Sequence, residues 1–131
     1  LTGTPNVPAL YAATAGYDLI EEIGVDRIRA NSMRQTAFLL DLVDEAGFES
    51  DSPRDADRRG GSVSFRVPEF QAVHRELAER QIICDYRPDT GLRFGPHYFT
   101  TDDELRFAVS QVAEIAASGA HERWLGAAAG Y

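Results

Sequence analysis

A chain of 131 residues with 44% hydrophobic and 26% charged residues is long enough for one globular domain with a substantial core. Its net charge of −8 argues against nucleic acid or an anionic membrane surface as the main partner, and no apolar run approaches the ~20 residues that a membrane span needs. The single cysteine excludes an internal disulfide and fits the reducing cytoplasm, where we expect the protein to work.

The N-terminal part of the chain is predicted to form an entry loop, residues 1–8, followed by two helices. The first helix begins near Ala9 and ends at Gly24, a residue type common at helix ends. The second helix runs from Val25 to Ala46, before Gly47. Because a single glycine joins the two helices, we expect a bent or hinged pair. The apolar positions at helical spacing are Leu10, Ala13, Tyr17 and Ile20 in the first helix and Ile28, Phe38, Leu39, Leu42, Val43 and Ala46 in the second.

The middle of the chain is predicted to contain two strands, a loop and a third helix. Residues 48–50 can form a short strand, and residues 51–61, rich in Asp and Arg, are expected to form an exposed, mobile loop. Residues 62–67 alternate with period two, which predicts a half-buried strand, and residues 68–80 read as a helix. The positions expected to face the core are Val63, Phe65, Val67, Phe70, Val73 and Leu77, and those expected to stay in solvent are Arg54, Arg58 and Arg59.

Two further strands and a last helix are predicted in the C-terminal part. The apolar run 81–84 and the alternating run 92–94 read as strands, joined through a turn at residues 87–91 that contains Pro and Gly. Residues 101–104, Thr-Asp-Asp-Glu, form a capping-box pattern that starts a helix. Residues 119–131 are expected to form a frayed tail. The helix is expected to bury Leu105, Ala108, Val109, Val112 and Ile115.

The order of these elements predicts an α+β fold. Strands joined by tight turns, with helices covering one face, make a small antiparallel or mixed sheet of three to four strands packed under helices. The helical pair would occupy residues 9–46 and the α+β sandwich residues 48–118. No internal repeat divides the chain, so we expect residues 1–131 to form a single domain.

Arg93 is the strongest candidate for a functional residue. Leu92-Arg93-Phe94 alternates, so Arg93 is expected to face away from its apolar neighbours. A guanidinium on a strand end, beside the break at Gly95-Pro96, could bind a planar anion, because its donors match a carboxylate at two points and its charge is permanent. The alternative is an ordinary surface arginine on an edge strand.

Two weaker candidates lie in turns. His97 follows Gly95-Pro96 near Arg93 and could line the same pocket, or it could simply cap the turn. The turn Gly3-Thr4-Pro5 offers a hydroxyl and open backbone amides to an anion, or it could be an ordinary entry into the first helix.

Metal binding and thiol chemistry have little support in the sequence. His74, His97 and His121 are dispersed, and neither a His-Glu-x-x-His pattern nor paired cysteines are found, so we expect no metal site. His74 lies beside the apolar stripe of its helix and is expected to be packed or half-exposed. Cys84 is followed by Asp85, whose charge raises a thiol pKa, so we expect no cysteine nucleophile.

The segment from Cys84 to Pro96 resembles the C-terminal small domain of pyridoxal 5'-phosphate (PLP) enzymes of the class V aminotransferase superfamily. It looks most like the kynureninase family, in which a strand–turn–strand of the form Cys-Asp-(aromatic)-Arg-Pro…Gly-(Leu/Ile)-Arg-(apolar)-(Gly/Ala)-Pro carries the arginine that binds the substrate α-carboxylate. On this chain the resemblance assigns that role to Arg93 and places His97 nearby. It also assigns Thr4, with Gly3, to the cofactor phosphate across a dimer interface.

The resemblance implies a full-length PLP enzyme of fold type I that hydrolyses kynurenine or 3-hydroxykynurenine to an anthranilate-type product and alanine, in tryptophan catabolism. Its N-terminal large domain would carry the lysine to which the cofactor is covalently bound. All 13 basic residues of this chain are arginine, so we expect no catalytic residue here and no activity of the chain alone. Because it begins at Leu1 rather than Met, we expect a piece of a longer polypeptide, working as a homodimer on a small amino acid.

Two alternatives remain open. Pro96-His97-Tyr98-Phe99 departs from the kynureninase pattern and also resembles cysteine desulfurase-like and epimerase-like members of the superfamily. The missing lysine is equally compatible with a stand-alone, non-catalytic α+β binding module.

Overall fold

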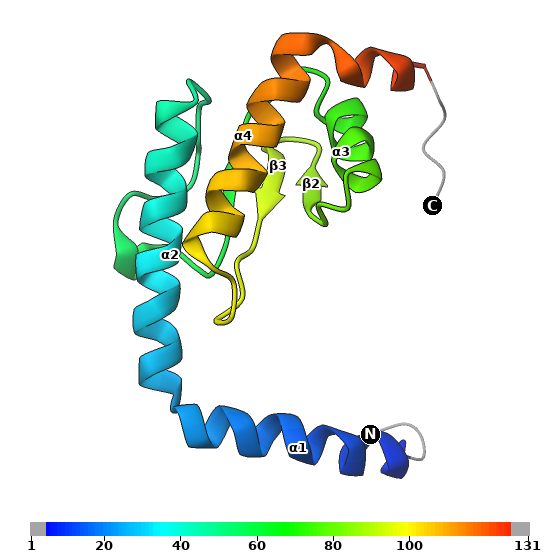
Figure 1. Cartoon of the computed structure of the whole chain (residues 1–131). Helices are drawn as coiled ribbons and strands as arrows, with labels where there is room; N and C mark the ends of the chain where they lie inside the picture. The colour runs from blue at the N-terminus through cyan, green and yellow to red at the C-terminus, as the bar shows by residue number, and fades with distance from the viewer. Residues whose placement is uncertain (1–4, 127–131) are drawn as a thin grey trace. The chain divides into compact units, whose positions relative to one another are not determined.

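The computed structural model describes residues 5–126 (Figure 1). The chain divides into two compact units, residues 1–31 and 32–131. Helix α2, Val25–Glu45, crosses this division, so its first turns belong to one unit and the rest to the other. Within the described residues, no helix is both long enough and apolar enough to span a membrane.

The first unit contains α1, Val7–Ile23, as predicted. The Asn6 side chain caps its start by accepting a hydrogen bond of 3.2 Å from the backbone N–H of Ala9. Gly24 ends the helix at φ 88°, a conformation that glycine adopts without strain. No residue of α1 is buried in the described structure. The large apolar side chains exposed on α1 are Val7, Leu10, Tyr11, Tyr17, Leu19 and Ile20.

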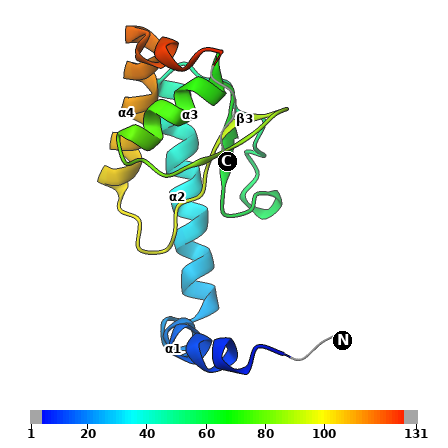
Figure 2. The ribbon, with the colours of Figure 1, turned by 90° about the vertical axis from the view of Figure 1, so that its right-hand side faces the viewer.

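The second unit is built on a three-stranded antiparallel sheet, which confirms the predicted fold class. Its strands are β1 (Val63–Phe65), β2 (Asp85–Arg87) and β3 (Gly91–Phe94), in the order β1-β3-β2. Helices α3 (Phe70–Glu79) and α4 (Asp102–Ser118) lie on one side of this sheet in both views (Figures 1 and 2). The arrangement is one layer of helices over one layer of strands.

A single apolar cluster fills the space between these layers. The inward positions predicted for α2, β1, α3 and α4 supply most of it, and Phe65 meets Phe94 edge to face with ring centroids 5.2 Å apart. Phe38, Ala46, Phe70 and Ala108 are partly buried at its margin. The buried members are Leu39, Leu40, Leu42, Val43, Val63, Phe65, Val67, Val73, Leu77, Leu92, Phe94, Leu105, Val109, Val112 and Ile115.

The predicted capping box at the start of α4 is confirmed. The Thr101 hydroxyl accepts a hydrogen bond of 3.2 Å from the backbone N–H of Glu104, and the Glu104 carboxylate accepts one of 2.7 Å from the backbone N–H of Thr101. Gly119 ends the helix at φ 73°. Local sequence therefore defines both ends of α4.

The strand predicted at residues 81–84 is wrong. Gln81 adopts φ 62° and closes the end of α3, and the backbone N–H of Ile82 donates to the carbonyl of Leu77 at 2.9 Å. The chain needs the next residues to reach the sheet, so β2 begins only at Asp85. Ile82 packs against the core, whereas Ile83 is 98% exposed, which explains how an apolar run misled the prediction.

The segment between α2 and β1 also differs from the prediction. Instead of a strand at residues 48–50, a single antiparallel bridge joins Glu49 to Arg66. Within the expected solvent loop, Arg59 is only 4% exposed. Its guanidinium donates to the Thr36 hydroxyl at 3.1 Å and to the carbonyl of Pro53 at 2.7 Å, so it ties the loop to α2.

The tail predicted after α4 is ordered in its first part. Residues 120–124 form the 3-10 helix η2, Ala120–Trp124, which packs against α3. The contact is polar, because Arg123 and Trp124 both donate hydrogen bonds to the buried carboxylate of Glu76. The fraying expected for these five residues is therefore wrong.

Candidate functional site

The sheet of the second unit has a polar face directed away from the helices. Leu92 and Phe94 of β3 are buried in the core, and Tyr86 of β2 packs on the rings of Phe70 and His74 from α3 at 5.4 and 5.1 Å. Because side chains alternate across a strand, the intervening residues lie on the opposite face. The polar face consists of Ser64, Asp85, Arg87 and Arg93.

Arg93 lies at the centre of this polar face, because β3 is the middle strand. The strand register places Ser64 opposite it on β1 and Asp85 opposite it on β2. Its Nη2 donates a hydrogen bond to the Asp85 carboxylate, and its side chain is 35% exposed. The predicted orientation of Arg93 is confirmed, whereas its role in binding a carboxylate stays a prediction.

Asp85 links Arg93 to a second arginine. Arg87 Nη1 donates to Asp85 Oδ1 at 3.1 Å, while Arg93 contacts Asp85 Oδ2. Burial acts to raise the pKa of Asp85, but the hydrogen bond from Arg93, the charges of both arginines and a hydrogen bond from the backbone of Tyr86 together hold that pKa below its ordinary value of 3.8. Asp85 is therefore an ionised carboxylate between two guanidiniums. Arg87, Asp85 and Arg93 together carry a net positive charge, which can attract an anion.

The turn between β2 and β3 places these charges and has the predicted location. The backbone N–H of Thr90 donates to the carbonyl of Arg87 at 3.2 Å, and Gly91 begins β3 at φ 83°. A Cβ on Gly91 would lie 2.3 Å from the carbonyl oxygen of Phe65, so no other residue fits without moving the backbone of β1. Gly91 therefore allows β1 and β3 to approach closely beside Arg93.

His97 lies in an exposed turn after β3, and its ring contacts are with Tyr98 and Phe99, at centroid distances of 4.5 and 4.3 Å. Its backbone carbonyl accepts a hydrogen bond of 2.9 Å from Gln35 Nε2. Among the interactions of the described residues, none joins His97 to Arg93. The structure thus does not bring the two predicted residues into one contact.

The other predicted site residues have simpler outcomes. Thr4 and Gly3 lie outside the described residues, so their contact with a phosphate stays a prediction. Burial, and then the charge of Asp85, raises the pKa of the Cys84 thiol from 9.0 to about 12, in the direction that the sequence predicted. Among residues 5–126, no group of three or more His, Cys, Asp or Glu side chains is placed to hold a metal ion.

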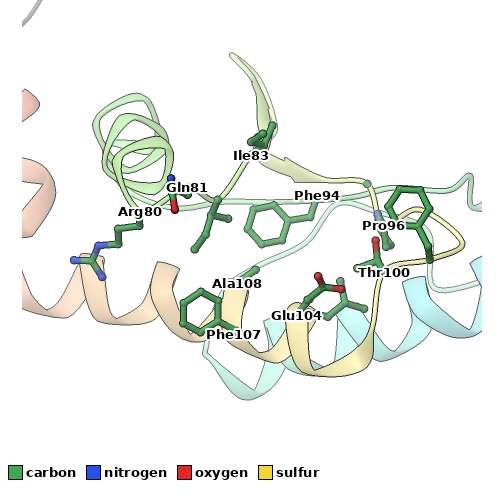
Figure 3. Close-up of a pocket in the computed structure, with 13 residues that line it drawn as sticks. Arg80, Gln81, Ile83, Phe94, Pro96, Thr100, Glu104, Phe107 and Ala108 are labelled. Atoms are coloured by element: carbon green, nitrogen blue, oxygen red, sulfur yellow. The ribbon is translucent and has the colours of Figure 1, made fainter.

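A separate, mostly apolar groove of about 360 Å³ opens between α4 and the segment that follows α3 (Figure 3). Phe94 forms its floor, and Phe107 and Ala108 line it from α4. Ile83 borders it from the opposite wall, with Pro96 and Thr100 at one end. Arg93 does not line this groove, so the groove and the polar face are different surfaces.

Sequence reasoning missed two residues that shape the site. Asp85 was considered only for its effect on Cys84, although residues 85 and 93 are equally distant from the centre of the predicted turn and therefore pair across it. Gln35 gave no such signal. Its burial beneath residues 97–100 depends on how α2 packs against a distant loop.

A family model and similar proteins both relate this chain to kynureninases. The model of the kynureninase C-terminal domain family matches residues 28–112. A kynureninase from Pseudomonas fluorescens is 33% identical over 120 residues, covering 88% of this chain and 29% of that protein. A kynureninase from Geobacillus thermodenitrificans is 29% identical over 114 residues, covering 84% of this chain and 27% of that protein. The chain thus spans less than a third of the length of these relatives.

Solved structures show the same fold at lower identity. The apo structure of a cysteine desulfurase from Thermococcus onnurineus superposes with a TM-score of 0.79 at 22% identity, covering 90% of this chain and 33% of that one. A NifS-like protein superposes with a TM-score of 0.73 at 15% identity, covering 89% of this chain and 35% of that one. At these identities the likeness concerns the fold alone.

Proposed function

Because the chain belongs to the kynureninase C-terminal domain family, we propose that it is the C-terminal domain of a PLP-dependent hydrolase acting on kynurenine or 3-hydroxykynurenine. The products would be an anthranilate-type compound and alanine. The family match over residues 28–112, together with kynureninases at about 30% identity, is the observation that carries this proposal.

In this function Arg93 binds the α-carboxylate of the substrate. The support is its position at the centre of the polar face, its partial exposure and the net positive charge that it forms with Arg87 and Asp85. A guanidinium that holds a carboxylate at two points restricts rotation of the amino acid around its Cα. Arg93 would therefore orient the substrate without taking part in bond making or breaking.

PLP, when bound, supplies the electron sink for this class of amino-acid chemistry. The chain has arginine at all 13 of its basic positions, so the lysine that binds the cofactor covalently must come from elsewhere in the polypeptide. The groups on the polar face fit the substrate side of such a site. Thr4, with Gly3, is proposed to contact the cofactor phosphate across a dimer interface, and His97 to border the substrate.

The partners in this proposal are the remaining polypeptide, including the large PLP domain, and a second copy of the protein. The chain spans under a third of its relatives, so most of such an enzyme would lie outside it. The apolar side chains exposed along α1, including Leu10 and Tyr17, would be covered by these partners. We place the assembly in the cytoplasm.

The test is a substitution at Arg93 in the full-length polypeptide, loaded with PLP. Arg93→Ala should raise KM for kynurenine by an amount equivalent to a loss of ~2–5 kcal/mol, because truncating one partner of a desolvated charge pair leaves the other unpaired. Steady-state hydrolysis of kynurenine and 3-hydroxykynurenine provides the measurement. Arg54→Ala is the matched control, since Arg54 forms an exposed ion pair with Asp44 in a different part of the second unit.

Two results would count against the proposal. If the full-length protein hydrolyses neither kynurenine nor 3-hydroxykynurenine, the proposed reaction is wrong. If the Arg93→Ala variant has unchanged KM and kcat, Arg93 is not part of the site. The cysteine desulfurase reaction is the second candidate, because residues 96–99 depart from the kynureninase pattern and resemble cysteine desulfurase-like members of the superfamily. Release of sulfide from L-cysteine by the same preparation, without kynurenine hydrolysis, would select it.

A further inference from the structure

Asp85 occupies a position that the proposed function does not explain. A carboxylate beside an arginine that binds carboxylates repels the same ligand, yet Asp85 faces Arg93 directly across the strand pair. The effect of Asp85 on substrate binding depends on whether it competes for the guanidinium or holds the guanidinium in place.

We propose that Asp85 is the positioning residue for Arg93: it fixes the guanidinium in the orientation that receives the substrate carboxylate. The inference rests on the proposed role of Arg93 and adds a residue to it. Directly opposed residues of antiparallel strands have their Cβ atoms ~5 Å apart, so the backbone pairing of β2 with β3 holds both groups.

The hydrogen bonds leave room for the ligand. Asp85 accepts from Nη2 of Arg93. Nη2 carries a second N–H, which can pair with the N–H of Nε or of Nη1, so an incoming carboxylate can still be bound at two points. Asp85 therefore uses a small part of the donor capacity of Arg93 while it restricts the long side chain. The entropy cost of ordering that side chain is met before the substrate arrives.

A second contact keeps Asp85 from turning away. Its Oδ1 accepts a hydrogen bond of 3.1 Å from Arg87 Nη1, so both carboxylate oxygens are engaged, one by each arginine. Two positive charges and one negative charge remain together on the polar face. The carboxylate of a substrate would neutralise the excess charge, which is why positioning outweighs competition here.

The test compares Asp85→Asn with the wild type in the full-length, PLP-loaded enzyme. The amide keeps the shape of the side chain but loses the charge and one of the two acceptor oxygens, so it can no longer hold both guanidiniums. KM for the amino-acid substrate should therefore rise about tenfold with kcat changed less than about twofold. Asp85→Glu retains the charge and should give an intermediate KM. Asp44→Asn, which breaks an exposed ion pair with Arg54, is the matched control and should leave KM unchanged.

A second readout separates positioning from structural damage. The inhibition constant of a competitive substrate analogue that lacks the α-carboxylate should be the same for Asp85→Asn and wild type, because that analogue does not use Arg93. A rise in that constant equal to the rise in KM would overturn the proposal in favour of a general structural role. Should Asp85→Asn fail to fold, Asp85→Glu supports the same comparison.

The remaining outcomes distinguish this inference from the proposed function. If Arg93→Ala raises KM and Asp85→Asn leaves it unchanged, the positioning role is overturned and the proposed function stands. If Asp85→Asn lowers KM, Asp85 competes with the substrate and the proposal is again overturned. If Arg93→Ala has no effect, the site itself is rejected together with any role of Asp85.

Discussion

Gln35 is a buried polar residue that connects α2 to the loop after β3. Its Nε2 donates to the carbonyls of His97 and Thr100 at 2.9 and 2.8 Å, and its side chain is fully buried. Its Oε1 is buried without a hydrogen-bond partner among the described residues. This side chain accordingly joins α2 to two carbonyls of the loop, of which that of His97 also accepts a hydrogen bond of 2.9 Å from the backbone N–H of Thr100.

Substitution of Gln35 should therefore destabilise the second unit. Gln35→Met keeps the length of the side chain but removes both hydrogen bonds to the loop, and we expect a loss of about 1–3 kcal/mol in the free energy of unfolding because the carbonyls of His97 and Thr100 both lose the donor on Gln35. Urea unfolding of the chain measures this change. Gln71→Met, at an exposed position of α3, is the control and should change stability little; an equal loss in both variants would contradict the explanation.

For Arg93, the alternation of side chains along a strand predicted the orientation of the side chain. Its ion-pair partner, Asp85, was not predicted. Alternation along Leu92-Arg93-Phe94 places the guanidinium opposite the core whatever the rest of the fold does. The ion pair with Asp85 follows from the register of β2 against β3, which the predicted turn at residues 87–91 implies but the strand placed at residues 81–84 obscured. His97 was placed near Arg93 by sequence distance alone, and no interaction of the described residues joins them.

The joint between α3 and η2 is held by a buried carboxylate. Glu76 is 5% exposed and accepts hydrogen bonds from Arg123 Nε at 2.8 Å, Trp124 Nε1 at 2.9 Å and Arg80 Nε at 3.2 Å. The hydrogen bond from Trp124 outweighs the opposing effect of burial and, with the arginines, lowers the pKa of Glu76 below its ordinary value of 4.5. An ionised Glu76 is thus the anchor for the segment after α4.

Trp124→Phe should weaken this joint while it retains the aromatic ring. Loss of one hydrogen bond to a charged group is expected to cost about 1.5–3 kcal/mol in the free energy of unfolding. Urea unfolding at neutral pH gives the value, with loss of η2 seen as faster amide exchange in residues 120–124. Unchanged exchange there would show that apolar packing, rather than Glu76, holds η2.

The stability of the same joint should depend on pH in a defined direction. Because the folded-state pKa of Glu76 is lowered, its contribution is fully present above the unfolded value of about 4.5 and is lost as the pH falls through the lower folded value. Glu76→Gln lacks this titration. The difference in unfolding free energy between wild type and Glu76→Gln, measured from pH 7 to pH 2, should therefore shrink on acidification; a difference that is constant over this range would contradict the role given to Glu76.

Taken as a whole, the chain exposes apolar surface in several places. Besides α1, the large exposed apolar side chains include Ile83 at the groove, with Phe99 and Phe107 nearby. Surfaces of this kind usually mark contacts with another part of a protein or with another chain. Under the proposed function, these surfaces would contact the large PLP domain and the second copy of the protein.

The 131-residue chain by itself should have no kynureninase activity. Without a lysine it cannot hold PLP covalently, so adding PLP and kynurenine to the purified chain should produce no anthranilate, and PLP alone should not give the visible absorbance of a lysine-bound cofactor. The full-length polypeptide under the same conditions is the control and should show both. Activity in the isolated chain would require a different chemistry and would reject the division of labour proposed above.

The sequence predicted best those features that depend on residues close together in the chain. The stop of α1 at Gly24, the capping box of α4, the inward positions of β1 and the turn at residues 87–91 all depend on residues close together in the chain. The strand at residues 81–84 was wrong because apolar composition cannot tell a strand from the chain that approaches it, particularly where Gln81 takes a left-handed conformation.

The amino-acid sequence by itself determined helices α1 to α4, the stop of α1 and the capping box of α4, and the alternation that turns Arg93 from the core. It also contains no lysine, so under the proposed function covalent catalysis falls to another part of the polypeptide. Tertiary structure alone decided which charges meet. The hydrogen bond of Arg59 to Thr36 of α2, the anchoring of η2 on Glu76 and the pairing of Asp85 with Arg93 join residues from different elements. Short-range propensities cannot specify such pairs, because they depend on the packing and register of the complete sheet and its helices.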